Sequence, residues 1–319
     1  MGGRLVDLLE RKLIFVTGKG GVGKSTIAAA LAWLAAARGK RTLVCEVDAK
    51  GNLADFFETA PTRFEEREIA PRLWAMSMDT EASLKQYLAL QLKLPLVARI
   101  GPLAKMFDFV ASAAPGVKEI VTVGKLCWEV KERHYDIVVV DASASGQIVG
   151  QLAAPQAINQ LVQVGLVRQQ TGWMLDILDD PATTGLAVVA TPAEMPVSET
   201  LELTARVRRE TRVDLAAVVV NRVLPELFGR GEEEVFERLA TPDPQARLDA
   251  ALGGSTESLI DAARLTVSMR RSRTEHLEAL RSAIDPGVPL LYMPYLFFRS
   301  HGLRATHQLA DALSAEMGY

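Results

Sequence analysis

The chain has 319 residues, of which 49% are hydrophobic and 24% charged, so it has enough apolar content for a sizeable buried core. Its formal net charge of −3 argues against a broad electrostatic affinity for DNA or for anionic lipid. No uninterrupted apolar run reaches the roughly 18 residues that a membrane-spanning helix needs, and the N-terminus lacks a secretory pattern, so we expect a cytoplasmic protein with no specific nucleic-acid partner and no integral membrane segment.

The expected elements alternate between strand and helix along most of the chain. An apolar run at 13–17 leads into a glycine loop, and an Ala/Leu-rich helix follows over 27–37. Short apolar runs of this kind suit strands that are buried on both faces of a parallel sheet. The later expected strands are 42–47, 73–78, 136–141, 185–191, 215–221 and 288–293, and the later helices are 195–211, a charged helical segment over 231–281, and 302–317. This alternation predicts an α/β fold with a doubly wound, mainly parallel sheet.

The stretch over 81–133 departs from this alternation. Its apolar residues between 84 and 110 recur at helix-like spacing, and three prolines divide it into pieces. The chain shows no Pro/Gly-rich linker, no low-complexity tract and no internal repeat. We therefore predict a single domain over 1–319 with a helical insertion at about 80–133.

The glycine loop after the first expected strand carries a phosphate-binding motif. Residues 18–25 read Gly-Lys-Gly-Gly-Val-Gly-Lys-Ser, which fits the phosphate-binding pattern G-x-x-x-x-G-K-[ST]. Glycines let backbone N–H groups curl around an anion, and the following helix presents its positive end to the phosphates. Lys24 would reach the β- and γ-phosphates, and Ser25 would place its hydroxyl on Mg²⁺. The predicted nucleotide contacts are Gly18, Lys19, Gly20, Gly21, Val22, Gly23, Lys24, Ser25 and Thr26.

Two aspartates follow expected strands and would complete this site. Asp48 comes after the second strand, where a carboxylate can orient and deprotonate the attacking water. Asp141 ends the most apolar strand, which is the position of a carboxylate that holds Mg²⁺, usually through water. The alternative for either residue is a helix N-cap. Asp55 fits a cap or a switch residue equally well, and the N–H of Gly146 is placed to sense the γ-phosphate.

Lys19 narrows the class of nucleotide-binding protein. The run Lys-Gly-Gly-Val-Gly-Lys-Ser-Thr resembles the deviant Walker A motif of the P-loop ATPases that include ParA, MinD, the nitrogenase iron protein and the Get3/ArsA proteins. The resemblance implies that Lys19 crosses a dimer interface and neutralises charge in the partner's site as the γ-phosphate leaves. A solvated loop lysine is the alternative interpretation.

Four segments resemble the Get3/ArsA branch of this group, and the similarity covers nearly the whole chain. Residues 48–55 resemble the first switch, Asp-Pro-Ala-His-Asn-Leu-Ser-Asp, and 141–147 the second, Asp-Thr-Ala-Pro-Thr-Gly-His. Residues 115–119 look like a Pro-Gly-x-x-Glu segment of the helical subdomain, and 180–200 like the region after the second switch. The resemblance implies a Mg²⁺-dependent ATPase with a single P-loop ATPase domain. Such a protein cycles between open and nucleotide-closed dimers, formed with itself or with a paralogous subunit.

The same resemblance assigns further contacts and a type of partner. It implies that Asn221 reads the adenine edge and that the loop from Pro294 to Phe297 closes over the base. An asparagine at a strand end is otherwise a common cap or turn residue. In Get3 relatives the helical subdomain forms an apolar groove for a hydrophobic protein client, and residues 84–110 have suitable side chains. Ordinary packing onto the sheet explains the same residues and is the simpler interpretation.

The departures from the family pattern limit the functional inference. Gly51 and Gln147 stand where the two switches carry histidine, and Gly51-Asn52 also echoes ParA-type switches. Only two cysteines are present, Cys45 and Cys127, and neither belongs to a C-x-x-C pair. Soft metalloids, zinc staples and iron–sulfur clusters need clustered thiolates, so arsenite transport is not expected. Both cysteines are interpreted as small buried hydrophobes in a reducing compartment.

Two other functions stay open at this point. The first is a ParA/MinD-type positioning ATPase that binds DNA or membrane, which would need a basic stripe or a basic amphipathic tail. The C-terminal tail over 303–319 has only Arg304 as a firm positive charge. The second is a scaffold with low turnover that acts through ATP-dependent dimerisation alone.

Overall fold

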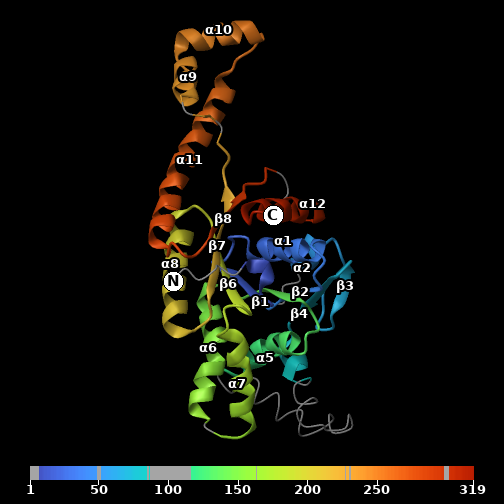
Figure 1. Ribbon diagram of the computed structural model, residues 1–319. Helices are drawn as coiled ribbons and strands as arrows, with labels where there is room; N and C mark the ends of the chain where they lie inside the picture. The colour runs from blue at the N-terminus through green and yellow to red at the C-terminus, as the bar shows by residue number, and fades with distance from the viewer. Residues whose placement is uncertain are drawn as a thin grey trace.

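The computed structural model describes residues 7–48, 52–84, 86, 116–162, 164–226, 228–229, 231–297 and 302–319. A single sheet of eight strands runs through this part of the chain, in the order β3-β4-β2-β5-β1-β6-β7-β8 (Figure 1). Every pairing is parallel except that of β3 with β4 at one edge. The strands are β1 Leu13–Gly18, β2 Thr42–Glu46, β3 Arg67–Ala70, β4 Leu73–Ser77, β5 Ile137–Asp141, β6 Thr184–Ala190, β7 Leu215–Val223 and β8 Leu290–Pro294. The expected α/β class and mainly parallel sheet are confirmed.

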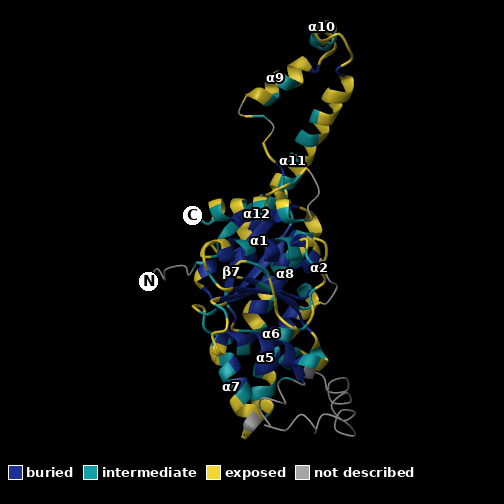
Figure 2. Ribbon diagram, turned by 90° about the vertical axis from the view of Figure 1, so that its right-hand side faces the viewer, coloured by how far each residue is buried: buried dark blue, intermediate teal, exposed yellow. Residues whose placement is uncertain are grey.

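Helices cover both faces of the sheet. One face carries α1 (Lys24–Ala37), α2 (Asn52–Phe56) and α12 (Leu303–Glu316), and the other carries α5 (Val117–Lys131), α6 (Ser145–Leu161), α7 (Leu166–Leu178) and α8 (Glu194–Glu210) (Figures 1 and 2). The central strand β1 is buried along its whole length, because its side chains alternate between the two layers. Leu13 and Phe15 pack in the layer of α5 to α8, whereas Ile14 and Val16 pack in the layer of α1 and α12.

The strand order brings three strand ends together at one edge of the sheet. β1 lies between β5 and β6, and β5 in turn lies beside β2. In this register Asp141 at the end of β5 is level with Val16 of β1 and with Glu46 of β2. Ligands of open α/β sheets bind outside the carboxyl ends of the strands, where the strand order reverses. The fold therefore places the glycine loop and the predicted aspartates at the expected crevice.

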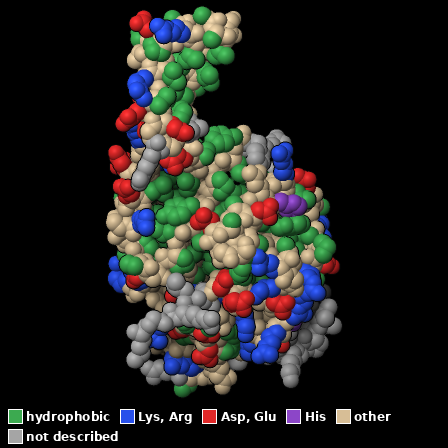
Figure 3. Space-filling model, turned by 45° about the horizontal axis from the view of Figure 1, so that its top comes forward, with side chains coloured by type: hydrophobic (Ala, Val, Ile, Leu, Met, Phe, Trp, Pro, Cys, Tyr) green, Lys and Arg blue, Asp and Glu red, His purple; other side chains and the backbone are tan. Residues whose placement is uncertain are grey.

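The charged segment over 231–281 forms a helical arm that projects from the body of the molecule (Figures 1 and 2). The arm consists of α9 (Glu232–Leu239), α10 (Pro242–Leu252) and α11 (Glu257–Ala283), inserted between β7 and β8. Gly231 and Gly253, both in left-handed backbone conformations, mark the start of α9 and the end of α10. Hydrophobic side chains lie along this arm (Figure 3), and the exposed ones are Val235, Leu239, Leu252, Leu259, Leu265 and Met269. The charged segment therefore also exposes apolar side chains.

Several elements were not expected from the sequence. β3 is a four-residue edge strand in which Arg67 and Glu68 are exposed and the other two residues are half-buried, so it lacks the apolar run that identifies the central strands. α6 contains Pro155 and has apolar residues on several sides, because it packs against α5, α7 and α8 at once. The helical character expected over 81–133 is seen in α5, but residues 87–115, with the proposed client groove, lie outside the described part of the chain. The division into one domain with an insertion at about 80–133 stays a prediction. None of the helices within the described ranges is both long and apolar enough to span a bilayer.

Candidate nucleotide site

The phosphate loop joins the end of β1 to the start of α1. Gly18 and Gly23 have φ values of +151° and +96°, in the region that favours glycine. A Cβ atom at Gly18 would lie 2.2 Å from the carbonyl oxygen of Val189, and one at Gly23 would lie 2.3 Å from Nδ2 of Asn221. Both glycines are therefore required by close packing as well as by backbone conformation. The loop leaves the first backbone N–H groups of the 14-residue helix α1 facing the crevice.

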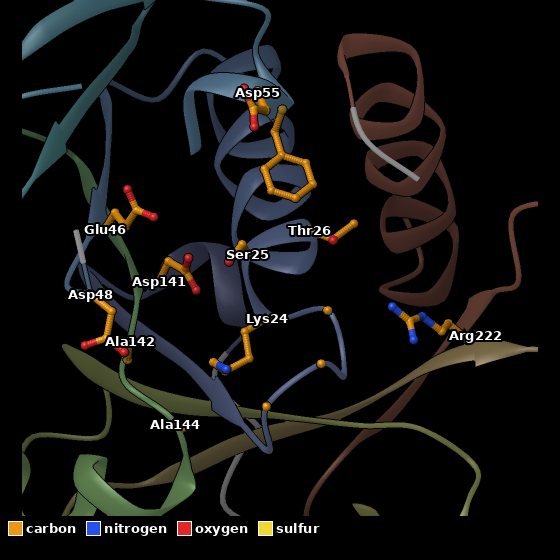
Figure 4. Close-up of a pocket in the computed structure, with 14 residues that line it drawn as sticks. Lys24, Ser25, Thr26, Glu46, Asp48, Asp55, Asp141, Ala142, Ala144 and Arg222 are labelled. Atoms are coloured by element: carbon orange, nitrogen blue, oxygen red, sulfur yellow. The ribbon is translucent and has the colours of Figure 1, made fainter. Parts of the chain in front are cut away.

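A cavity of about 490 Å³ opens above this loop (Figure 4). Lys24, Asp48 and Asp141 lie on one side of the loop, and Arg222 lies on the other. The predicted residues Gly20, Gly21, Gly23, Lys24, Ser25, Thr26, Asp48 and Asp141 all line it, together with Glu46, Asp55, Phe56, Ala142, Ala144 and Arg222. The structure thus brings together most of the phosphate and metal residues expected from the sequence. Gly146 lies in the first turn of α6, exposed and outside this lining.

Asp141 is buried at the end of β5 and has the properties of a cation ligand. The hydroxyl of Ser25 favours the charged form of its carboxyl group, while Oδ1 is buried and has no hydrogen-bond partner. Burial raises the pKa of Asp141 to about 6, although Ser25 and the nearby Lys24 ammonium act to lower it. A buried, unpartnered carboxylate oxygen beside a serine hydroxyl fits a hard, oxygen-preferring cation such as Mg²⁺. Ser25 and Asp141 therefore stay the predicted position of the metal.

Asp48 is held by a short chain of side chains that was not expected. Ser143 Oγ donates to Asp48 Oδ1 at 3.4 Å, and Gln151 Nε2 donates to Ser143 Oγ at 3.0 Å. The backbone of Ser143 is fixed as well, because Thr17 Oγ1 donates to its carbonyl oxygen at 2.7 Å. In the second-switch pattern quoted above, alanine stands at the position of Ser143. The serine at this position is the sequence feature that could have indicated these hydrogen bonds.

Lys19 points away from the cavity. Its ammonium forms an ion pair with Oε1 of Glu199 on α8, and both side chains are about one third exposed. The neighbouring Lys24 instead lies over the loop, with Nζ 3.5 Å from the carbonyl oxygen of Lys19. Within the described part of the chain, Lys19 does not belong to the cavity lining. The two lysines of the motif therefore occupy different environments, and Glu199 is a partner that sequence reasoning missed.

A second cavity of about 210 Å³ adjoins the first. It is lined by Thr26, Asn221, Arg222, Pro294, Tyr295, Leu296 and Leu309, so the two residues expected beside adenine are brought together. Asn221 is 4% exposed, and both of its polar atoms are engaged in the protein. Nδ2 donates to the carbonyl oxygen of Val22 at 2.9 Å, and Oδ1 accepts the N–H of Arg222 at 2.9 Å. Asn221 thus fixes the phosphate loop, and its contact with adenine stays a prediction.

Glu46 was also missed, although it is buried at 2% exposure beside the predicted metal position. It ends β2, level with Asp141 of β5, and Ser77 Oγ donates to its Oε2 at 3.4 Å. Because Glu46 and Asp141 carry charge of the same sign, Glu46 adds to the rise in the pKa of Asp141. Its position as an acidic residue at the end of an apolar strand could have indicated a place in the site. The sequence offered no reason to prefer Glu46 over Asp48.

Comparison with known proteins agrees with this geometry. The family model described as "Anion-transporting ATPase" matches residues 11–175. The chain is similar to the ATPase BagA of Mycobacterium tuberculosis, with 30% identity over 96% of this chain and 93% of that protein. It is also similar to a putative arsenical pump-driving ATPase of Halobacterium salinarum, at 28% identity over 70% of this chain and 37% of the relative. The ATPase get3 of Schizosaccharomyces japonicus is 32% identical over 50% of this chain and 49% of its own.

Proposed function

Since this chain belongs to the anion-transporting ATPase (ArsA) family and is an ATPase of the ArsA/Get3 type, we propose that it acts as a cytoplasmic, Mg²⁺-dependent dimeric switch. In this proposal, ATP closes the dimer, and hydrolysis reopens it to deliver or remodel a hydrophobic protein or a membrane partner. The observation that carries the proposal is the convergence of Lys24, Ser25, Asp48 and Asp141 on one cavity at the strand ends.

Each of these residues has a distinct role in the proposed hydrolysis. Lys24 binds the β- and γ-phosphates, and the backbone amides of the loop and of the first turn of α1 cradle the α- and β-phosphates, which fixes the triphosphate against the loop. Ser25, and Asp141 through a water molecule, would hold Mg²⁺, and the ion would supply positive charge against the phosphate oxygens. Asp48 orients the attacking water and accepts its proton, and the hydrogen bond from Ser143 keeps the Asp48 carboxylate turned into the cavity.

The dimer in this proposal rests on Lys19. Its ammonium is paired with Glu199 of the same chain and does not serve its own cavity. A cation in the phosphate loop that is directed outward is available to a second subunit, where it would neutralise charge on the departing γ-phosphate. We propose that Lys19 exchanges Glu199 for the partner's nucleotide when the dimer closes, with a second copy or a paralogue as partner.

Arsenite is not the cargo in this proposal. Cys45 lies within β2 and Cys127 within α5, and both thiols are buried. Burial raises the pKa of each thiol far above its ordinary value, which disfavours the thiolate that a soft metalloid needs. A hydrophobic protein client or a membrane protein is the better fit to the resemblance with Get3 proteins.

Steady-state hydrolysis of ATP tests the site assignment. We expect Lys24→Ala and Asp48→Asn each to lower turnover at least 100-fold, since they remove a phosphate cation and the base. Asp311→Asn, an exposed aspartate of α12, is the matched control and should leave turnover unchanged. If Lys24→Ala and Asp48→Asn both hydrolyse ATP at the wild-type rate, the site assignment is wrong.

Sedimentation in the presence of ATP and Mg²⁺ tests the switch. The Asp48→Asn variant should accumulate as a closed dimer, because it binds ATP but cannot hydrolyse it. Adding Lys19→Ala to that variant should lower the dimer fraction. A monomer under all nucleotide conditions would contradict the dimer proposal, and dimerisation without any measurable hydrolysis by the wild type would favour the scaffold function.

A further inference from the structure

Arg222 lies at the boundary of the two cavities of the nucleotide site. It lines the larger cavity with the phosphate loop and the smaller cavity with Asn221 and Pro294. Thr26 is the other residue common to both linings. We propose that Arg222 is a nucleotide-binding residue whose guanidinium contacts the α-phosphate, where the phosphates meet the nucleoside. This inference rests on the proposed function, because it assumes that the two cavities together hold one ATP.

The backbone of β7 is shaped to present this side chain. Val220 is level with Tyr292 of β8, but Val223 is level with Pro294, so two β7 residues oppose one β8 residue between these pairs. Such a bulge re-aims a side chain near a strand end. Arg222 also has φ of +60°, a left-handed conformation that is uncommon for residues other than glycine, asparagine and aspartate. The hydrogen bond from its N–H to Asn221 Oδ1 holds it there.

The charges that line the larger cavity favour a second phosphate-binding cation beside Lys24. Four carboxyl groups line it, from Glu46, Asp48, Asp55 and Asp141, against the cations Lys24 and Arg222. A triphosphate adds further negative charge, so its binding requires every cation that can reach it. Lys19 is paired with Glu199 on α8, and Lys24 serves the β- and γ-phosphates, so Arg222 is left for the α end.

The side chain of Arg222 is free to bind. It is exposed, and within the described part of the chain its guanidinium forms no hydrogen bond or ion pair. A guanidinium offers a planar fork of N–H donors that matches a phosphate group in a bidentate manner. Figure 4 shows Arg222 across the phosphate loop from Asp48 and Asp141.

The position of Thr26 favours the α-phosphate over the other phosphates. Thr26 follows Ser25 in the first turn of α1, the region whose amides cradle the α- and β-phosphates. The smaller cavity beyond it has the side chains of Pro294, Tyr295, Leu296 and Leu309, which suit the flat face of a base. Arg222 and Thr26 both line the two cavities. Arg222 therefore lies at the α-phosphate and ribose end of the ligand.

Equilibrium binding of ADP and of adenosine, measured by calorimetry and by competition with a fluorescent ADP analogue, tests the proposal. We expect Arg222→Asn to raise the Kd for ADP about tenfold, the loss that one charge-assisted hydrogen bond at an exposed site predicts. Asparagine tolerates the left-handed backbone, so folding should be preserved. Arg222→Lys should recover part of the affinity, and adenosine, which lacks a phosphate, should compete equally well in all variants.

Arg133→Asn is the matched control, because Arg133 also has a left-handed backbone (φ +57°) but lies at the end of α5, outside both cavities. Its Kd for ADP should equal that of the wild type. Unchanged ADP binding in Arg222→Asn, or an equal loss for adenosine, would overturn the α-phosphate contact. If Lys24→Ala weakens ADP binding but Arg222→Asn does not, only this inference fails. If neither variant does, the proposed nucleotide site itself is wrong.

Discussion

Replacing Glu199 by glutamine should release Lys19 and raise ATP turnover at low protein concentration. The two side chains form an ion pair that is about one third exposed on each side, 30% for Lys19 and 33% for Glu199. An ion pair of this exposure contributes about 0.5 to 1 kcal/mol after allowance for solvent screening. Its loss corresponds to about a two- to fivefold increase in the fraction of free lysine. If closure of the dimer needs this lysine, the association constant of the dimer should rise by this factor. Turnover at protein concentrations below the dissociation constant should rise by the same factor.

The assay is ATP hydrolysis as a function of protein concentration, with Glu202→Gln as the matched control. Glu202 lies one turn further along α8, is exposed, and should have no effect when changed. In the Lys19→Ala background, Glu199→Gln should do nothing, because the pair is already broken. A gain that persists without Lys19, or equal turnover of wild type and Glu199→Gln at every concentration, would refute the idea that Glu199 restrains the signature lysine.

Three further predictions follow from the site. Gly23→Ala should lower the free energy of unfolding in urea by about 2 kcal/mol, because the backbone at Gly23 is left-handed and the added Cβ would lie 2.3 Å from the amide nitrogen of Asn221. Gly20→Ala is the control, since an added Cβ there meets no atom within 4 Å, and it should change this free energy by less than about 0.5 kcal/mol. Gln151→Leu should reduce kcat about fivefold with little change in KM, because it removes the donor that fixes Ser143 beside the proposed base, and an equal rise in KM would contradict this role. The rise in the pKa of Asp141 from 3.8 to about 6 means that the folded, nucleotide-free protein binds a proton more readily than the unfolded chain. Its contribution to stability is therefore present below pH 4 and lost as pH rises through 6, a change of about 3 kcal/mol that urea titrations at several pH values should show for the wild type and not for Asp141→Asn. Binding of Mg²⁺ should in turn weaken below pH 6, where the carboxyl group is protonated.

The central part of the fold and the phosphate site could be predicted because their patterns are local. A strand buried on both faces must be apolar throughout, and a loop that binds phosphate must be rich in glycine, so the segments 13–18 and 137–141 are recognisable without any neighbour. The edge strand β3 and the helix α6 were not recognised, since the first has almost no buried face and the second is buried on too many sides to show one periodic stripe.

The parts of the site that were missed depend on contacts between distant segments. Ser143 and Gln151 gain their role only because β5 and α6 bring them beside Asp48, and Glu199 faces Lys19 across 180 residues of sequence. No spacing rule links such residues, because their distance is set by the packing of α6 and α8 on the sheet. The resemblance predicted that Asn221 and Pro294 lie beside adenine, and the structure shows that the asparagine holds the phosphate loop in place.

Sequence alone determined that this chain binds and hydrolyses a nucleotide, because the chemistry of phosphate and Mg²⁺ binding requires particular residues at fixed short spacings. Tertiary structure alone decided where each charge points. Lys24 faces the cavity and Lys19 faces Glu199, although the two lysines are five residues apart in one loop. It also decided that Arg222 lines both the larger and the smaller cavity, through a bulge that depends on the pairing of β7 with β8. The direction of a side chain follows from the backbone that long-range packing imposes, and a residue's neighbours in sequence do not fix it.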